Sequence, residues 1–188
     1  MRKLFSTILI SILCISATSD LSVYSVKVAD ATGHAFELDK LRKNKLNAFV
    51  FLLTDCPASQ YYTLTLNGLE EKYHSQGVEV IAVFSGKFAK AEEIQRFQKD
   101  YKLKLSVLLD SQSALAKKFG ATIAPEVFLA DKQGKTIYSG RIDDTYYAPG
   151  RKKTKMTSAD LQNAIDHFLS GKTLEIKSTK AIGCILEF

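Results

Sequence analysis

The feature that most constrains this chain is the apolar run 48–53, which ends at Thr54-Asp55 and is followed directly by Cys56-Pro57. A continuous run that contains Val and two Phe predicts a strand buried on both faces. Proline suits the first turn of a helix, because its missing N–H has no partner there in any case. We therefore expect Cys56 at the junction between a buried strand and a helix N-terminus.

A cysteine in this place is a candidate nucleophile. The helix dipole and the free backbone N–H groups of the first turn stabilise a thiolate. The opposing interpretation is a buried structural thiol, which is the common state of a free cysteine. Asp55 supports that interpretation, because a nearby carboxylate disfavours the thiolate. Thr54 and Ser59 either donate hydrogen bonds to the thiolate or cap the helix and fill space.

Strand-like and helix-like segments alternate along the rest of the chain. Apolar periodicity predicts helices over about 57–74, 89–101, 111–119 and 158–169. Further strands are expected over 78–84 and 103–109, and a hairpin over 126–139. We expect only short extended pieces before residue 39, a polar connection over 39–46 and an irregular basic loop over 146–156. This order predicts an α/β fold with right-handed parallel crossovers and an antiparallel hairpin.

The N-terminus has the three parts of a secretory signal peptide, namely a positive start, an apolar stretch over 4–15 and small residues at Ala17 and Ser19, which fit cleavage after Ser19. The apolar stretch is too short for an ordinary transmembrane helix. A lipoprotein acylated at Cys14 is the second interpretation, although Leu13 stands where a small residue is expected. We expect domains over 1–19 (signal peptide), 20–170 (the folded domain) and 171–188 (a tail that carries Cys184).

Composition and charge exclude several classes of function. The chain is 46% hydrophobic, which suffices for a sizeable core, and losing Arg2 and Lys3 with the leader lowers the net charge from +6 to +4. The basic run 151–155 indicates a solvated loop and not a nucleic-acid-binding surface. Scattered histidines and only two mature cysteines disfavour a zinc or copper site. No phosphate loop or dinucleotide fingerprint is present, so no bound cofactor is expected.

Three residue groups resemble the thioredoxin-fold redoxin family, the group of alkyl hydroperoxide reductases and thiol-specific antioxidants. These groups are the strand that ends in Thr-Asp-Cys-Pro-Ala-Ser, the segment from Gly120 to Phe128, and the segment from Tyr138 to Asp144. The resemblance covers roughly residues 28–170. It implies a thioredoxin-like three-layer α/β sandwich, in which a central mixed sheet has helices on both faces.

The resemblance also implies roles for individual residues. Pro125 would be a cis proline that faces Cys56, and Arg141 would lie near Cys56, where it either stabilises the thiolate or pairs with Asp143 or Asp144. A partner would be bound by Thr54, Pro57, Ser59, Ala124, Pro125 and Gly140.

Two departures from the family pattern bear on the reaction. Ser59 stands where a dithiol thioredoxin has its second cysteine, and a hydroxyl cannot resolve a disulfide. Leu53 lies three residues before Cys56, where a peroxiredoxin has Thr or Ser, and the preceding strand holds no proline; this weakens a peroxidase interpretation. Similar exported redoxins often carry a tail cysteine, so Cys184 is the candidate resolving residue. The sequence leaves open whether Cys56 and Cys184 pair.

The resemblance favours an exported thiol–disulfide oxidoreductase, periplasmic or secreted, with Cys56 as nucleophile. Its partners would be exported protein thiols or disulfides and an external thiol reductant, with no nucleic acid, and a membrane only if Cys14 is lipidated. Two alternatives stay open. One is a thiol peroxidase, and the other is a non-catalytic binding module of redoxin fold.

Overall fold

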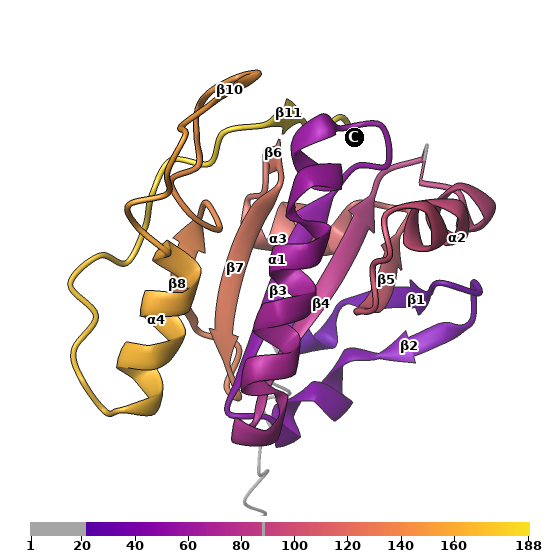
Figure 1. Ribbon diagram of the computed structural model, residues 1–188. Helices are drawn as coiled ribbons and strands as arrows, with labels where there is room; N and C mark the ends of the chain where they lie inside the picture. Colours follow the sequence, from indigo (N-terminus) through magenta and orange to yellow (C-terminus); the bar gives the residue numbers. More distant parts are fainter. Residues whose placement is uncertain (1–21, 88) are drawn as a thin grey trace, which may run out of the picture.

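A seven-stranded mixed sheet forms the centre of the protein, in the order β2-β1-β5-β4-β3-β7-β8. The structure, a computed structural model, describes residues 22–87 and 89–188 (Figure 1). Strands β3, β4 and β5 run parallel, and the other pairings in this sheet are antiparallel. The seven strands are β1 (Lys27–Asp30), β2 (Ala35–Glu37), β3 (Leu46–Leu52), β4 (Val78–Ser85), β5 (Ser106–Asp110), β7 (Glu126–Asp131) and β8 (Thr136–Gly140).

Strand β3 confirms the prediction made from the apolar run. All seven of its residues are buried, and it pairs with β4 on one side and β7 on the other. Alternate residues of a strand point to opposite faces. Ala48, Val50 and Leu52 accordingly pack in one core, and Phe49 and Phe51 pack in a second core on the other face.

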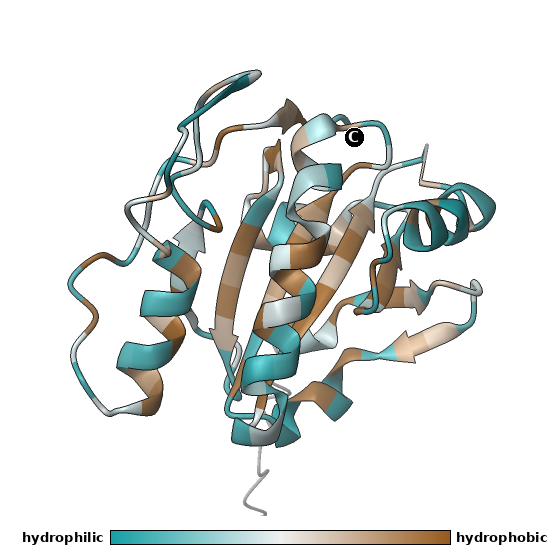
Figure 2. Ribbon diagram, viewed as in Figure 1, coloured by the Kyte–Doolittle hydropathy of each residue, from teal (hydrophilic) through white to brown (hydrophobic). Residues whose placement is uncertain are grey.

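Helices cover both faces, as the expected three-layer sandwich requires. The first core includes side chains of α1 (Pro57–Tyr73), α2 (Ala91–Asp100) and α4 (Asp160–Leu169). The second core includes side chains of α3 (Ala114–Phe119) and the short 3₁₀ helices η1 (Val23–Ser25) and η2 (Leu38–Lys43). Figure 2 shows apolar strands between helices whose outer faces are polar.

Three segments differ from the sequence-based expectation. Residues 39–46, expected as a polar connection, contain most of η2, because Leu38 and Leu41 reach the second core. Residues 146–156 contain the hairpin of β9 (Tyr146–Ala148) and β10 (Arg151–Lys152), not an irregular loop. Helix α3 starts at Ala114, three residues after the expected start at residue 111. The Asp110 carboxylate, outside the helix, accepts hydrogen bonds from the N–H groups of Leu115 and Ala116 in its first turn.

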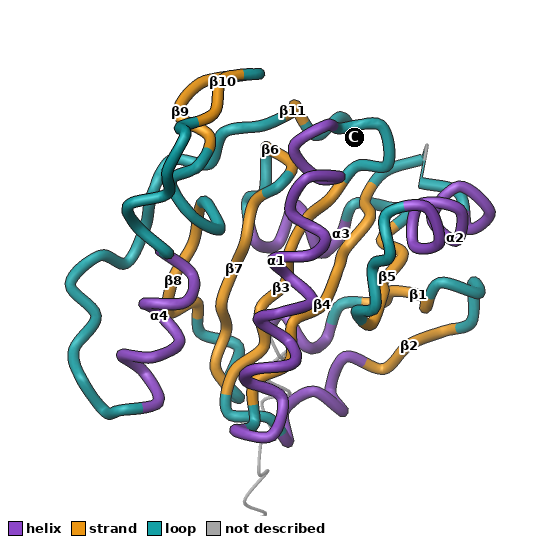
Figure 3. Tube along the Cα trace, in the orientation of Figure 1, coloured by secondary structure: helices purple, strands orange, loops and turns teal. Residues whose placement is uncertain are grey.

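The chain after α4 runs back across the molecule as a tail, mostly without regular structure (Figure 3). It first pairs with the outer edge of β8, where Ser139 N donates to Lys177 O and Thr179 N donates to Ser139 O, both at 3.0 Å. It then forms β11 (Cys184–Ile185) against β6 (Ile123–Ala124). The C-terminus thereby reaches the end of the sheet at which β3 meets α1.

Candidate functional site: a disulfide at the start of helix α1

Cys56 lies at the N-terminus of α1, as the sequence predicts. It is the N-cap residue, with extended backbone angles, and Pro57 occupies the first turn. The first turn carries no acidic residue, so the positive end of the helix dipole acts on the sulfur without a carboxylate from that turn. Only 1% of the residue is exposed.

Cys56 is joined to Cys184 by a disulfide bond that connects residues 128 positions apart, with the two Cα atoms 6.0 Å apart. The sequence left this pairing open. In β11, Cys184 stands opposite Ala124, and Leu186 N donates to Thr122 O at 2.9 Å. The pairing of β11 with β6, which directly precedes Pro125, thus holds Cys184 next to Cys56.

The carbonyl oxygen of Ala124 lies 3.2 Å from Cys56 Sγ. A disulfide sulfur has no proton to donate, so this is a van der Waals contact in the oxidised protein. When the disulfide is reduced, the same oxygen is placed to accept a hydrogen bond from the Cys56 thiol. The Ala124–Pro125 peptide bond is cis, as the resemblance implied, and Pro125 is buried.

The backbone of the tail comes unusually close to the rest of the protein, and glycine residues make this possible. A Cβ on Gly183 would lie 2.0 Å from the Ala124 carbonyl oxygen and 3.0 Å from Pro125 Cδ. A Cβ on Gly140 would lie 2.1 Å from Thr179 O. Ala124, Pro125 and Gly140, expected to bind a partner, are therefore covered by the protein's own tail in the oxidised state.

The other residues expected near the Cys56 sulfur are Ser59, Thr54 and Pro57, and they differ in burial and in hydrogen bonding. The Ser59 hydroxyl is fully buried and accepts the N–H of Leu53 at 3.1 Å, which fastens the helix to the end of β3. Thr54 is half-buried, and its carbonyl oxygen accepts a hydrogen bond from the Gln60 side chain at 3.0 Å. Pro57 is exposed at the surface beside Cys56. Their roles toward a partner stay predictions.

Arg141 has a different ion-pair partner from the ones that were expected. Its Nε lies 2.7 Å from Asp160 Oδ2, and the hydrogen bond to Asp160 is the main cause that raises the pKa of the guanidinium. Asp143 instead accepts a hydrogen bond from the Tyr62 hydroxyl, and Asp144 binds Lys153. The pairing with Asp143 or Asp144 was wrong because the start of α4 brings Asp160 to this loop, a contact that local sequence does not reveal.

Aromatic side chains cluster next to the start of α1. Tyr61, Tyr62 and Tyr146 form a cluster with ring centroids 5.2–5.9 Å apart, and the Lys152 ammonium lies 4.3 Å from the Tyr61 ring centroid. Tyr61 is 45% exposed. Burial, and then the hydrogen bond to Asp143, raises the pKa of the Tyr62 phenol, so this group stays protonated.

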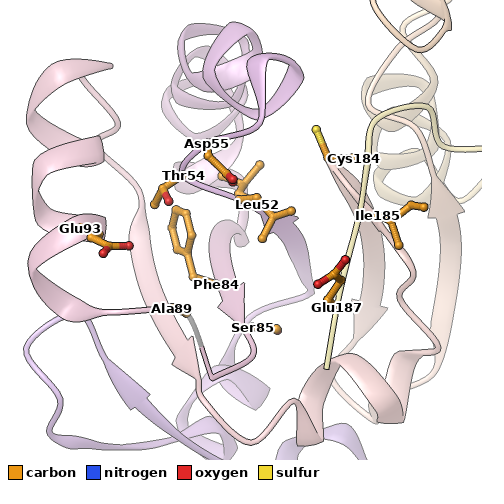
Figure 4. A pocket seen from close by; sticks show the side chains of 11 residues that line it. Leu52, Thr54, Asp55, Phe84, Ser85, Ala89, Glu93, Cys184, Ile185 and Glu187 are labelled. Carbon is orange, nitrogen blue, oxygen red and sulfur yellow. The ribbon is translucent and has the colours of Figure 1, made fainter.

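A pocket of about 410 Å³ opens beside the disulfide, between the ends of β3 and β4 and the tail. Cys184 lines it, together with Thr54, Asp55, Glu93 and Glu187 (Figure 4). Cys56 is not among its lining residues. The two cysteines of the disulfide therefore have different surroundings, because Cys56 is buried and Cys184 lies at the cavity.

Over residues 22–87 and 89–188, no cluster of three or more His, Cys, Asp or Glu side chains is arranged to hold a metal ion. Within the same residues, no helix has the length and apolarity needed to cross a bilayer. The expected signal peptide and the acylation site at Cys14 lie outside the described residues.

The sequence model of the Redoxin family matches residues 18–151. The chain belongs to this family. It is 34% identical, over 110 residues, to the thiol-disulfide oxidoreductase ResA of Bacillus thuringiensis; the match covers 58% of this chain and 62% of that protein. The chain thus spans less than two thirds of the length of the curated relatives that it matches.

Solved structures support the fold. A hypothetical protein from Sinorhizobium meliloti superposes with a TM-score of 0.72 at 28% identity, covering 87% of this chain and 90% of that one. A secreted disulfide oxidoreductase from Mycobacterium tuberculosis superposes with a TM-score of 0.58 at 15% identity, covering 77% of this chain and 96% of that one. The thioredoxin-like α/β architecture expected from the sequence is thereby confirmed.

Proposed function

We propose that this protein is a thiol–disulfide oxidoreductase whose redox group is the Cys56–Cys184 disulfide. The observation that carries the proposal is the bond itself, which links a helix N-terminal cysteine to a cysteine on a thin tail. The name of the Bacillus relative points to the same reaction. The expected signal peptide makes exported proteins the natural partners, in the periplasm or outside the cell.

The proposed cycle starts from the reduced protein. The Cys56 thiolate attacks one sulfur of a partner disulfide; a bond forms between Cys56 Sγ and that sulfur, and the other partner sulfur leaves as a thiolate that takes a proton. The Cys184 thiolate then attacks Cys56 Sγ, forms the internal disulfide and releases the second partner thiol. Two electrons pass from the protein to the partner, and no bound cofactor takes part.

The surroundings of Cys56 suit both steps. The start of α1 stabilises the thiolate, which is the attacking species. Before Cys56 ionises, Ala124 O accepts a hydrogen bond from its thiol. A partner segment at Pro125 would occupy the place that Gly183 and Cys184 hold in the oxidised protein, so release of the partner and return of the tail are the same event.

Reduction of insulin disulfides by the protein, with dithiothreitol as electron donor, tests the proposal. Wild-type protein should speed insulin precipitation over dithiothreitol alone, and Cys56→Ser should remove that gain. Cys184→Ser should accumulate a mixed disulfide on Cys56, visible by mass spectrometry. The variant Leu64→Ala, at an exposed position of α1, is the control and should reduce insulin at the wild-type rate.

Three outcomes separate the functions. Insulin reduction that depends on Cys56 supports the oxidoreductase. Rapid consumption of hydrogen peroxide by the reduced protein, without insulin reduction, would establish the thiol peroxidase instead. If no dithiol reduced the Cys56–Cys184 bond in the folded protein, the non-catalytic binding module would be the remaining interpretation.

A further inference from the structure

The two cysteines of the disulfide differ in exposure. Cys56 is 1% exposed, enclosed by the start of α1, the Ala124 carbonyl group and β11. Cys184 is half-buried, and its side chain lines the pocket of about 410 Å³ between β3, β4 and the tail (Figure 4). Thiol–disulfide exchange requires a thiolate to reach one sulfur of the bond directly, so access decides which sulfur is attacked.

The two sulfurs also differ as leaving groups. Attack on Cys184 expels Cys56 as a thiolate at the N-terminus of a 17-residue helix with no acid in its first turn. Attack on Cys56 would expel Cys184 as a thiolate beside a pocket lined by the carboxylates of Glu93 and Glu187. Asp55 also lines this pocket but directly precedes Cys56 in the chain, so its charge acts on both sulfurs and does not distinguish them. Lys90 Nζ lies 3.9 Å from Glu93 Oε1. The thiolate with the lower pKa leaves faster, so Cys56 is the better leaving group.

Access and leaving-group stability therefore agree. We propose, on the basis of the proposed function, that electrons enter the oxidised protein through Cys184, and that Cys56 is kept for the partner disulfide. The two half-reactions then use different cysteines. This goes beyond a resolving role for Cys184, because the reductant forms its mixed disulfide with the tail cysteine.

The step balances with an external thiol as the reductant. A reductant thiolate attacks Cys184 Sγ; the new bond joins the reductant sulfur to Cys184, and the Cys56–Cys184 bond breaks with its electron pair going to Cys56 Sγ. A second reductant thiolate attacks the reductant sulfur of this mixed disulfide and releases Cys184 as a thiolate. Two thiols are oxidised to one disulfide, and the protein gains two electrons and, from solvent, two protons.

The position of the first mixed disulfide tests the proposal. Oxidised wild-type protein is mixed with cysteamine, a small thiol whose ammonium group offsets the pocket carboxylates. Samples are quenched with acid within the first turnover, free thiols are blocked with N-ethylmaleimide at low pH, and peptides are mapped by mass spectrometry. The earliest samples should carry cysteamine on Cys184 and maleimide on Cys56, in at least about tenfold excess over the reverse pattern.

Extrapolation to zero time is part of the measurement, because the freed Cys56 thiolate can attack the cysteamine sulfur and move the label. Cysteamine on Cys56 at zero time would overturn the proposal while leaving the oxidoreductase intact. Absence of any exchange would instead refute the proposed function. The two failures are therefore distinguishable in one experiment.

A pair of variants gives an independent readout. Ala89→Trp places a large side chain at the pocket wall, whereas Leu64→Trp adds the same side chain at an exposed position of α1 that does not line the pocket. Ala89→Trp should slow reduction by cysteamine about tenfold, and Leu64→Trp should leave the rate unchanged. Equal rates for both variants would argue against attack through the pocket.

Discussion

At the scale of single residues, glycine decides where the tail can lie. Gly183 passes so close to Ala124 that a side chain has no room, and Gly140 meets Thr179 in the same way. In both places the atom nearest to the missing Cβ is a backbone carbonyl oxygen. The sulfur of Cys184 reaches Cys56 because the residue before it has no Cβ.

Gly183→Ala should therefore weaken the disulfide. The added Cβ would meet Ala124 O at 2.0 Å, so β11 must move away from β6 and from Cys56. In a glutathione redox buffer we expect the balance to shift toward the reduced form by about tenfold or more, which is about 1.4 kcal/mol or more of lost disulfide stability. The measurement is the fraction of disulfide at equilibrium, after alkylation.

Gly68→Ala is the matched control, because it adds the same methyl group to α1, where nothing beyond the adjacent residues and the backbone of the helix itself lies within 4 Å. It should leave the redox equilibrium unchanged and stabilise the helix slightly. An unchanged equilibrium in Gly183→Ala would show that the close approach does not govern disulfide formation.

Cys184→Ser tests what the bond contributes to folding. A disulfide that closes a loop of 128 residues restricts the unfolded chain strongly, and its loss should lower the free energy of unfolding by about 2–4 kcal/mol. Urea unfolding under oxidising conditions measures this. Wild-type protein in dithiothreitol should unfold at nearly the same urea concentration as the variant; a wild type unaffected by reductant would contradict the prediction.

Local sequence signals were enough to place Cys56. An apolar run followed by Cys-Pro specifies strand, junction and helix within a dozen residues, and the structure has each of them. The partner of Cys56 could not be read in this way, because it lies 128 residues away and depends on the tail crossing Ala124. The Arg141–Asp160 pair was missed for the same reason, since it joins the loop after β8 to the start of α4, which only the fold brings together.

At the scale of elements, the hairpin β9–β10 shows how a basic segment becomes ordered. The sequence predicted an irregular loop because its charges suggested solvation. In the structure the buried carboxylate of Asp144 binds Lys153 Nζ at 2.5 Å and accepts the N–H groups of Thr157 and Ser158. One acid therefore ties the end of the hairpin to the segment that begins α4.

These contacts predict a dependence of stability on pH. The hydrogen bond from Lys153, followed by that from Thr157, lowers the pKa of Asp144 below its ordinary value of about 4. A lowered pKa in the folded state means that the stabilisation is present above about pH 4 and is lost as the pH falls toward the folded-state pKa. Asp144→Asn should remove this part of the acid destabilisation and lower stability at pH 7.

Unfolding free energies measured from pH 7 to pH 2 check this expectation. Asp100→Asn, at an exposed position at the end of α2, serves as the control and should keep the wild-type profile. If Asp144→Asn and wild type had parallel profiles, Asp144 would not be the group whose protonation loosens this region.

At the scale of the whole molecule, a doubly covered sheet carries a thin tail fixed at two places. The sheet and its two cores follow from alternating apolar strands and amphipathic helices, which is why the fold class was predictable. The tail buries few apolar side chains, so its path follows backbone contacts that have no sequence period. It pairs with β8 at residues 177–179 and with β6 at residues 184–186.

The two attachments should respond differently to reduction. The pairing with β6 contains two residue pairs and is held by the disulfide, whereas the pairing with β8 is supported by Thr179 Oγ1, which lies 2.6 Å from the Tyr138 hydroxyl and accepts Arg141 N. Reduction should speed amide hydrogen exchange at Leu186 by about tenfold or more, with little change at Thr179, because only the first site loses its covalent support. Hydrogen exchange of the oxidised and reduced forms, resolved by residue, measures both amides at once. Faster exchange at both would mean that the tail leaves as one unit; unchanged exchange at Leu186 would mean that β11 stays docked without the bond, and that a partner must displace it to reach Cys56.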